Sequence, residues 1–140
     1  MKNNKIFRLE EQFNYKGLNC YIGFYQLGHR IAGVEIPYNK ANFTNILKLE
    51  ISINCDYSDK NDENQCYIIE NDFDHINNSY DIEGYKSIWG KDVDQERIEI
   101  MERRNKEELS MRSIVGSKEL AEEKCRYLVN KCYNNNLIVE

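Results

Sequence analysis

The chain contains 140 residues, which is enough for one domain with a single hydrophobic core. A hydrophobic content of 41% and a charged content of 31% are typical of a globular protein and argue against intrinsic disorder. The formal net charge of −5 makes duplex nucleic acid an unfavourable partner, and no apolar run is long enough to span a membrane. The first eleven residues lack the apolar core of a signal peptide, and the five cysteines lack a Cys-x-x-Cys pair. We therefore expect reduced thiols in a cytoplasm.

The segment from Phe13 to Pro37 predicts a β-hairpin. Apolar residues alternate with other residues along two runs, namely Cys20, Ile22 and Phe24 in the first run and Ala32, Val34 and Ile36 in the second. A period of two is typical of strands that are buried on one face. Gly28 lies between the runs and supplies the permissive backbone that a tight reversal needs.

Further strands are expected after the hairpin. The strictest alternation of apolar and polar residues runs from Leu47 to Cys55, and it predicts a half-buried strand. Tyr67 begins another strand that extends towards Phe73. The polar segments Asp56–Gln65 and Asn77–Glu83 are expected as loops, and Tyr85–Trp89 as one more short strand.

The last third of the chain predicts two helices. Asp92 or Asp94 can cap a helix that ends at Leu109 and carries a thin apolar stripe, formed by Ile98, Met101 and Leu109. Ser117 can cap a second helix, in which apolar residues recur at helical spacing at Ala121, Cys125, Leu128 and Cys132.

The order of these elements predicts an α+β fold. We expect a single domain, residues 1–140, with an N-terminal antiparallel β-sheet (about 6–90) followed by two C-terminal α-helices (92–134). The strand at Leu47–Cys55 should face the core and pack on Ala121, Cys125 and Leu128. Because the stripe of the first helix is so thin, we expect that helix to help form a homo-oligomer interface.

Arginine and aromatic residues are the strongest chemical signal in the composition. Five of the seven arginines lie between Arg97 and Arg126, and the chain has ten tyrosines, five phenylalanines and one tryptophan. An aromatic ring that stacks and a guanidinium that binds oxygens are what an adenine nucleotide requires. Ion pairs on a solvent-exposed helix surface are the plainer explanation for some of the same arginines.

An acidic stretch offers a different interpretation. The segment from Asp56 to Glu83 contains nine acidic residues and one lysine. Such a segment could mimic nucleic acid in the basic groove of a partner protein. The plainer explanation is a set of loops with one solvated sheet face, which we favour because Tyr67-Ile68-Ile69 interrupts the acids.

Short motifs are spread over most of the chain. Gly28-His29-Arg30 precedes Val34-Glu35-Ile36-Pro37, the segment Tyr67–His75 is rich in aromatic residues, and Arg112-Ser113 precedes Glu122–Cys125. These strings resemble a family of small phage and prophage proteins that carry Gly-His-Arg-x-Gly-Tyr-Val-x-Ile-Pro after a first strand. The family's other motifs are a strand ending in Gly-Phe-Asp-x-Ala-His and a final Arg-x-Leu-x-x-Val-x-x-Glu-Cys-Lys helix. Three positions depart from the family: Ala32 and Asn71 stand where it has glycine, and Gly33 where it has tyrosine.

The family includes the first class of Thoeris anti-defence sponges. These phage proteins sequester a cyclic ADP-ribose signal made by bacterial TIR enzymes, and some also hold cyclic oligonucleotides. The resemblance implies an oligomer in the host bacterial cytoplasm, with the ligand between protomers. It implies that Phe73 contacts the base and ribose and that Arg112, with Arg103 and Arg104, meets the phosphates. His29 and Arg30 match the motif and either bind the ligand or brace the hairpin. The changes at Ala32 and Gly33 leave the ligand's identity open.

Three functions follow as hypotheses. The first is a non-enzymatic immune-evasion protein that sequesters a cyclic nucleotide or cyclic ADP-ribose-type signal without cleaving it. The second is an acidic, protein-binding inhibitor of a bacterial defence complex, of the anti-CRISPR type. The third is a phosphodiesterase. It is the weakest hypothesis, because the chain has only two histidines and shows no known catalytic motif. We expect no catalytic residue, metal or cofactor, and no membrane or duplex nucleic acid as a partner.

Overall fold

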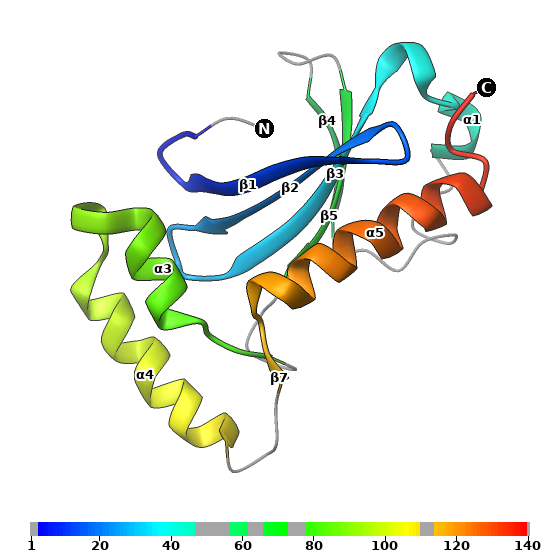
Figure 1. Cartoon of the computed structure of the whole chain (residues 1–140). Coiled ribbons are helices and arrows are strands. Elements are labelled where there is room, and N and C mark those ends of the chain that lie inside the picture. Colours follow the sequence, from blue (N-terminus) through cyan, green and yellow to red (C-terminus); the bar gives the residue numbers. More distant parts are fainter. Residues whose placement is uncertain (1–2, 47–56, 62–65, 73–77, 110–113, 140) are drawn as a thin grey trace.

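The computed structural model describes residues 3–46, 57–61, 66–72, 78–109 and 114–139. An antiparallel five-stranded sheet with the order β1-β2-β3-β5-β4 forms its first half (Figure 1). The strands are β1 (Phe7–Tyr15), β2 (Leu18–Tyr25), β3 (Arg30–Pro37), β4 (Tyr57–Asn61) and β5 (Cys66–Asp72). The expected α+β fold, a sheet followed by helices, is confirmed.

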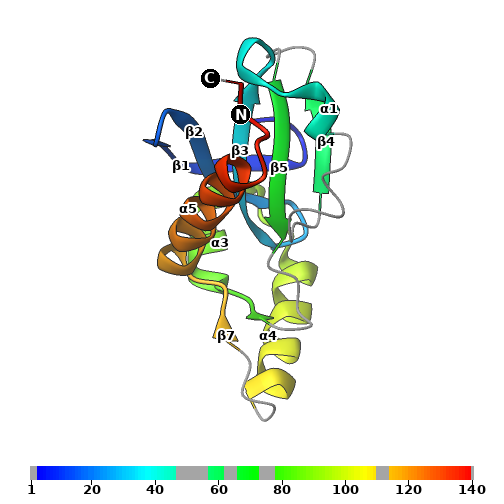
Figure 2. The ribbon, with the colours of Figure 1, turned by 90° about the vertical axis from the view of Figure 1, so that its right-hand side faces the viewer.

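Three longer helices follow the sheet, namely α3 (Ile82–Trp89), α4 (Gln95–Leu109) and α5 (Lys118–Asn134). A short parallel pair joins β6 (Asn78–Ser79) to β7 (Ile114–Val115). Single-turn elements complete the described chain: η1 (Tyr38–Lys40), α1 (Phe43–Ile46) and η2 (Gly90–Asp92). Figure 2 shows α5 beside the strands and α4 extending away beyond the sheet. Within the described residues, no helix is both long and apolar enough to cross a bilayer.

The predicted hairpin is confirmed as β2 and β3. The amide of Gly28 donates to the carbonyl of Tyr25, and the amide of Tyr25 donates to the carbonyl of His29, both at 2.9 Å. Gly28 has a φ of +96°, which disfavours any residue with a Cβ. A Cβ there would also lie 2.5 Å from the sulfur of Met101 on α4, so a larger residue at position 28 would force the Met101 side chain to shift.

The sheet is buried on both faces along β2 and β3, whereas the alternation predicted one buried face. The face that carries Cys20, Ile22 and Val34 packs on α5 through Ala121, Cys125, Leu128 and Val129. At the other end of that face, Phe24 packs on α3 and α4. The opposite face carries Tyr21 and Ile31, both fully buried. Strand alternation therefore identified the strands but not the second buried layer.

Helix α5 forms as the sequence predicts. The Ser117 hydroxyl accepts a hydrogen bond from the Leu120 amide and so caps the first turn. Its apolar residues Ala121, Cys125 and Leu128 are all fully buried, as expected. These side chains pack on β2 and β3. The strand expected at Leu47–Cys55 lies outside the described residues, so its predicted packing on α5 stays a prediction.

Three local predictions are wrong. Tyr85–Trp89, expected as a strand, belongs to helix α3, which Asp81 caps by accepting from the Gly84 amide. The sheet part therefore does not extend to residue 90. The loop expected at Asp56–Gln65 contains strand β4, and polar edge strands lack the apolar alternation that would reveal them. The loop expected at Asn77–Glu83 contains strand β6 and the first residues of α3. In α4, Ile98 and Met101 are buried within the chain, so these two residues need no partner subunit to cover them, and the subunit interface stays a prediction.

Candidate anion-binding site

Side chains from α3 and α4 hold the turn between β2 and β3. Three backbone carbonyls of this turn region accept hydrogen bonds from side chains of the two helices. That of Phe24 accepts from the Trp89 indole at 3.2 Å, that of Gln26 from the Tyr85 hydroxyl at 2.7 Å, and that of Leu27 from Arg97 Nε at 2.6 Å. Satisfied carbonyls fix the turn on the helices, so His29, which follows it, has a defined position.

Tyr80 is fixed on α4 by the side chain of Asn105. The Tyr80 amide donates to Asn105 Oδ1 at 2.7 Å, and Asn105 Nδ2 donates to the Tyr80 carbonyl at 2.8 Å. One side-chain amide thereby pairs with both backbone groups of Tyr80, as a neighbouring strand would. The Tyr80 ring is held between α4 and the turn, with only 5% of its surface exposed.

Three side chains meet at the Tyr80 hydroxyl. Arg104 Nη1 donates to it at 3.0 Å and Arg97 Nη2 at 3.5 Å, and His29 Nε2 lies 3.1 Å away. The His29 ring also stacks on the Tyr80 ring, with the centroids 5.4 Å apart and the planes inclined by 13°. We call Tyr80, His29, Arg97 and Arg104 the Tyr80 cluster.

The arginine side chains of the cluster carry positive charge that no described carboxylate neutralises in an ion pair, although Asp94 lies nearby and accepts a hydrogen bond from the Arg97 backbone amide at 3.4 Å. Among the residues that the structure describes, no carboxylate forms an ion pair with Arg97 or Arg104. Both side chains are half-buried, and most of their N–H donors are not used by the hydrogen bonds given above. Partly desolvated guanidiniums with spare donors can bind an oxyanion such as a phosphate, with an aromatic pair beside it.

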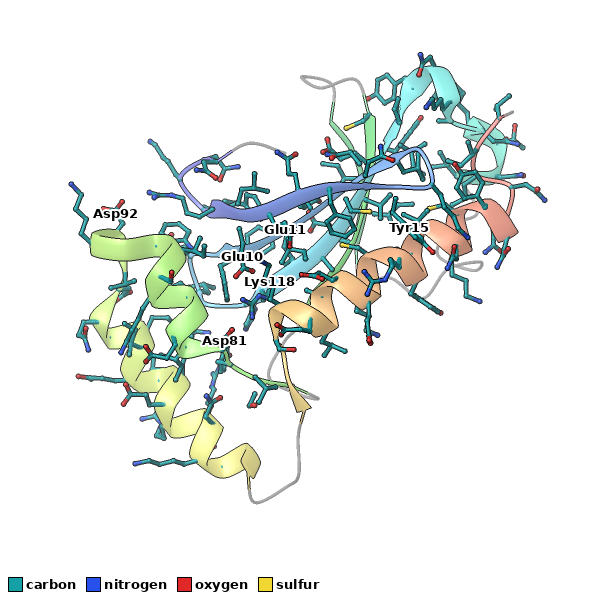
Figure 3. The ribbon with its side chains drawn as sticks, viewed as in Figure 1. Glu10, Glu11, Tyr15, Asp81, Asp92 and Lys118 are labelled. Atoms are coloured by element: carbon teal, nitrogen blue, oxygen red, sulfur yellow. The ribbon has the colours of Figure 1, made fainter. Side chains whose placement is uncertain are left out.

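Arg30 has a structural role instead. Its side chain is 3% exposed, and it donates to both Glu10 oxygens at 2.9 and 2.7 Å and to Asp81 at 2.6 Å. It also donates to the Gly116 carbonyl at 2.8 Å, and its guanidinium lies 4.4 Å from the centre of the Phe24 ring. Figure 3 shows Glu10 and Asp81 near the start of α5. Burial lowers the pKa of Arg30, but the hydrogen bonds to Glu10 and Asp81 outweigh it and raise the pKa overall. These bonds brace the hairpin against β1 and the helices.

Of the remaining site residues predicted from the sequence, three lie within the described residues and two lie outside them. His29 and Arg104 come together in the Tyr80 cluster, and Arg103, the residue before Arg104 on α4, is exposed. Phe73 and Arg112 lie outside the described residues. The sequence analysis did not select Arg97 or Tyr80. The spacing of seven residues between Arg97 and Arg104 is two helical turns and places both on one face, which was the available signal for Arg97.

Two acids of the Asp56–Glu83 stretch are used inside the protein. Asp81 pairs with Arg30, and Glu70 is 3% exposed, with hydrogen bonds from the hydroxyls of Tyr21 and Tyr25. Burial raises the pKa of Glu70, although both hydrogen bonds act in the opposite direction. These carboxylates are therefore not available on an acidic surface for a partner.

Comparison with known proteins gave no significant match to a family model, a curated protein or a solved structure.

Proposed function

We propose that this chain binds a cyclic nucleotide or cyclic ADP-ribose-type signal without cleaving it. In this proposal it is a phage-encoded anti-defence protein of the Thoeris type. Sequestration lowers the free concentration of the signal, so that the host effector is not activated. The protein acts as a homo-oligomer in the cytoplasm of the host bacterium.

One observation carries the proposal. Arg97 and Arg104, which lack a carboxylate partner among the described residues, converge on one hydroxyl beside a stacked histidine and tyrosine. The two guanidiniums would bind phosphate oxygens, and an adjacent ring would contact the base or ribose. The hydrogen bonds of Asn105 to Tyr80 and of Arg97 to the Leu27 carbonyl hold these groups in place before a ligand arrives. Such preorganisation reduces the entropic cost of binding.

The first experiment separates three classes of function. The purified protein is incubated with a panel of cyclic nucleotides and cyclic ADP-ribose isomers, separated from free compound and heat-denatured. Intact compound released from the protein supports sequestration. A cleaved product would indicate a phosphodiesterase, and no uptake of any compound would favour an inhibitor that binds a protein of the defence complex.

A second experiment locates the site. Calorimetry on Arg104→Ala and Arg97→Ala should show affinity lower by a factor of ten or more, because each loses a charge-assisted bond worth roughly 1.5–3 kcal/mol. Lys106→Ala is a matched control, because it removes one positive charge from an exposed position on the same helix. Equal affinity in the wild type and both arginine variants would place the site elsewhere.

A further inference from the structure

A second set of polar groups lies at the opposite end of the molecule from α4. The turn between β1 and β2, formed by Lys16 and Gly17, is there beside the C-terminal half of α5 (Figure 1). An open cavity of about 500 Å³ is lined by Lys16, Asn130, Tyr133 and Asn134. Tyr15, which precedes the turn, lies towards α5 in Figure 3 and packs on the core that this helix covers. The cavity is within the size range of small-molecule sites.

Hydrogen bonds between the lining residues leave donors to spare. Lys16 Nζ donates to Asn130 Oδ1 at 2.7 Å, which engages the oxygen of that amide and leaves its N–H groups. The Tyr133 hydroxyl donates to the Lys16 carbonyl, which fixes the turn on the helix. The lysine ammonium retains further protons. A cavity with surplus donors is suited to a ligand rich in acceptors.

The part of α5 that lines the cavity belongs to a basic segment of an acidic protein. The segment from Lys124 to Val139 has three basic residues and no acidic residue, whereas the whole chain has a net charge of −5. Arg126 is half-buried and lies one helical turn before Asn130, on the same face. Within the described ranges, no carboxylate pairs with Lys16 or Arg126. Basic residues often offset the negative C-terminal end of a helix, which accounts for Lys131 but not for Lys16 on the strand turn.

We propose that this cavity binds a small phosphate ester, independently of the Tyr80 cluster. Lys16 supplies the charge nearest to the phosphate, Arg126 adds to the positive potential, and the amides of Asn130 and Asn134 donate to the remaining oxygens. The cavity is larger than an inorganic phosphate ion, so the organic part of the ester occupies the rest of the space.

The test is an NMR titration of the ¹⁵N-labelled full chain in phosphate-free buffer, with AMP and with inorganic phosphate as probes. We expect saturable shifts at Gly17 and the Asn130 side chain, with AMP binding more tightly than phosphate. Lys16→Asn should weaken AMP binding about tenfold, because one charge-assisted contact is lost. The variant preserves the fold, because positions 16 and 17 have φ of 51° and 87°, and an Asn-Gly pair favours that turn.

A second variant tests the charge without relying on the turn. Asn130→Asp keeps a partner for Lys16 but adds a negative charge, so AMP binding should fall by more than tenfold. Lys91→Asn, at an exposed position away from the cavity, is the matched control and should bind as the wild type does. Arg104→Ala should also leave these shifts unchanged, which separates this site from the proposed signal-binding site. The proposal is overturned if neither probe gives saturable shifts at millimolar concentration, or if Lys16→Asn and Asn130→Asp both retain wild-type affinity.

Discussion

Replacing Arg30 with methionine should destabilise the whole domain. Methionine keeps an apolar stem over Phe24 but provides no donor for Glu10, Asp81 or the Gly116 carbonyl. Glu10 and Asp81 are themselves 11% and 28% exposed, so their charges would be left in a partly desolvated place. Removing one partner of a buried ion pair costs about 3–5 kcal/mol. In a domain of this length that corresponds to a fall in Tm of roughly 10–20 °C.

The matched control is Arg8→Met. Arg8 also lies over an aromatic ring, Trp89, at 4.6 Å, and also pairs with an aspartate, Asp92, at 2.9 Å. The two side chains of this pair are 30% and 49% exposed, however, so its loss should cost at most about 1 kcal/mol. Urea denaturation and thermal melting of both variants give the comparison. If Arg30→Met melts within a few degrees of the wild type but loses ligand binding, the bracing role is refuted and Arg30 belongs to the site.

Three further predictions concern single positions. Glu70→Gln should stabilise the protein at pH 8 but not at pH 4. The raised pKa of Glu70 means that its favourable contribution is present below the unfolded pKa, about 4.3, and is lost as pH rises through the folded pKa. Equal differences in urea stability at the two pH values would contradict this. Gly28→Ala should cost about 2–4 kcal/mol, more than Gly90→Ala, because both have positive φ but only the Cβ at 28 would meet a side chain, that of Met101. Equal losses in melting experiments would show that the contact with α4 is unimportant. Ser117→Ala should cost about 1 kcal/mol through loss of the cap on α5, and Ser117→Thr should restore most of it. An alanine variant as stable as the wild type in urea would exclude that role for the hydroxyl.

The sequence predicted an element correctly where a single pattern, either strand alternation or helical spacing of apolar residues, extended over the whole element. Alternation gave β2 and β3, and Ser117 followed by apolar residues at helical spacing gave α5. The run Tyr85–Trp89 failed because a short apolar segment has no period long enough to separate strand from helix. Tyr85 and Trp89 are four residues apart and are both buried in the same cluster, as one helix face requires. The capping residue Asp81 was the missed signal.

The candidate site was less readable, because it depends on contacts between distant segments. His29 follows a strand turn, Tyr80 lies beside a two-residue strand, and Arg104 is in a helix. No pattern within any one of these segments predicts that the three side chains come into contact. For Arg30 the motif match left ligand binding and bracing of the hairpin both open, and burial with three protein partners accounts for its charge by bracing.

The contacts of Arg30 also constrain the order in which the chain can fold. Its partners lie 20, 51 and 86 residues away in sequence, at Glu10, Asp81 and Gly116. During synthesis the hairpin leaves the ribosome long before Gly116, so a buried position for this guanidinium must wait for the last third of the chain. Contacts of such long range slow folding. A chain that ends before Gly116 therefore cannot complete the contacts of Arg30, and we expect such a fragment to hold the hairpin less firmly than the whole chain does.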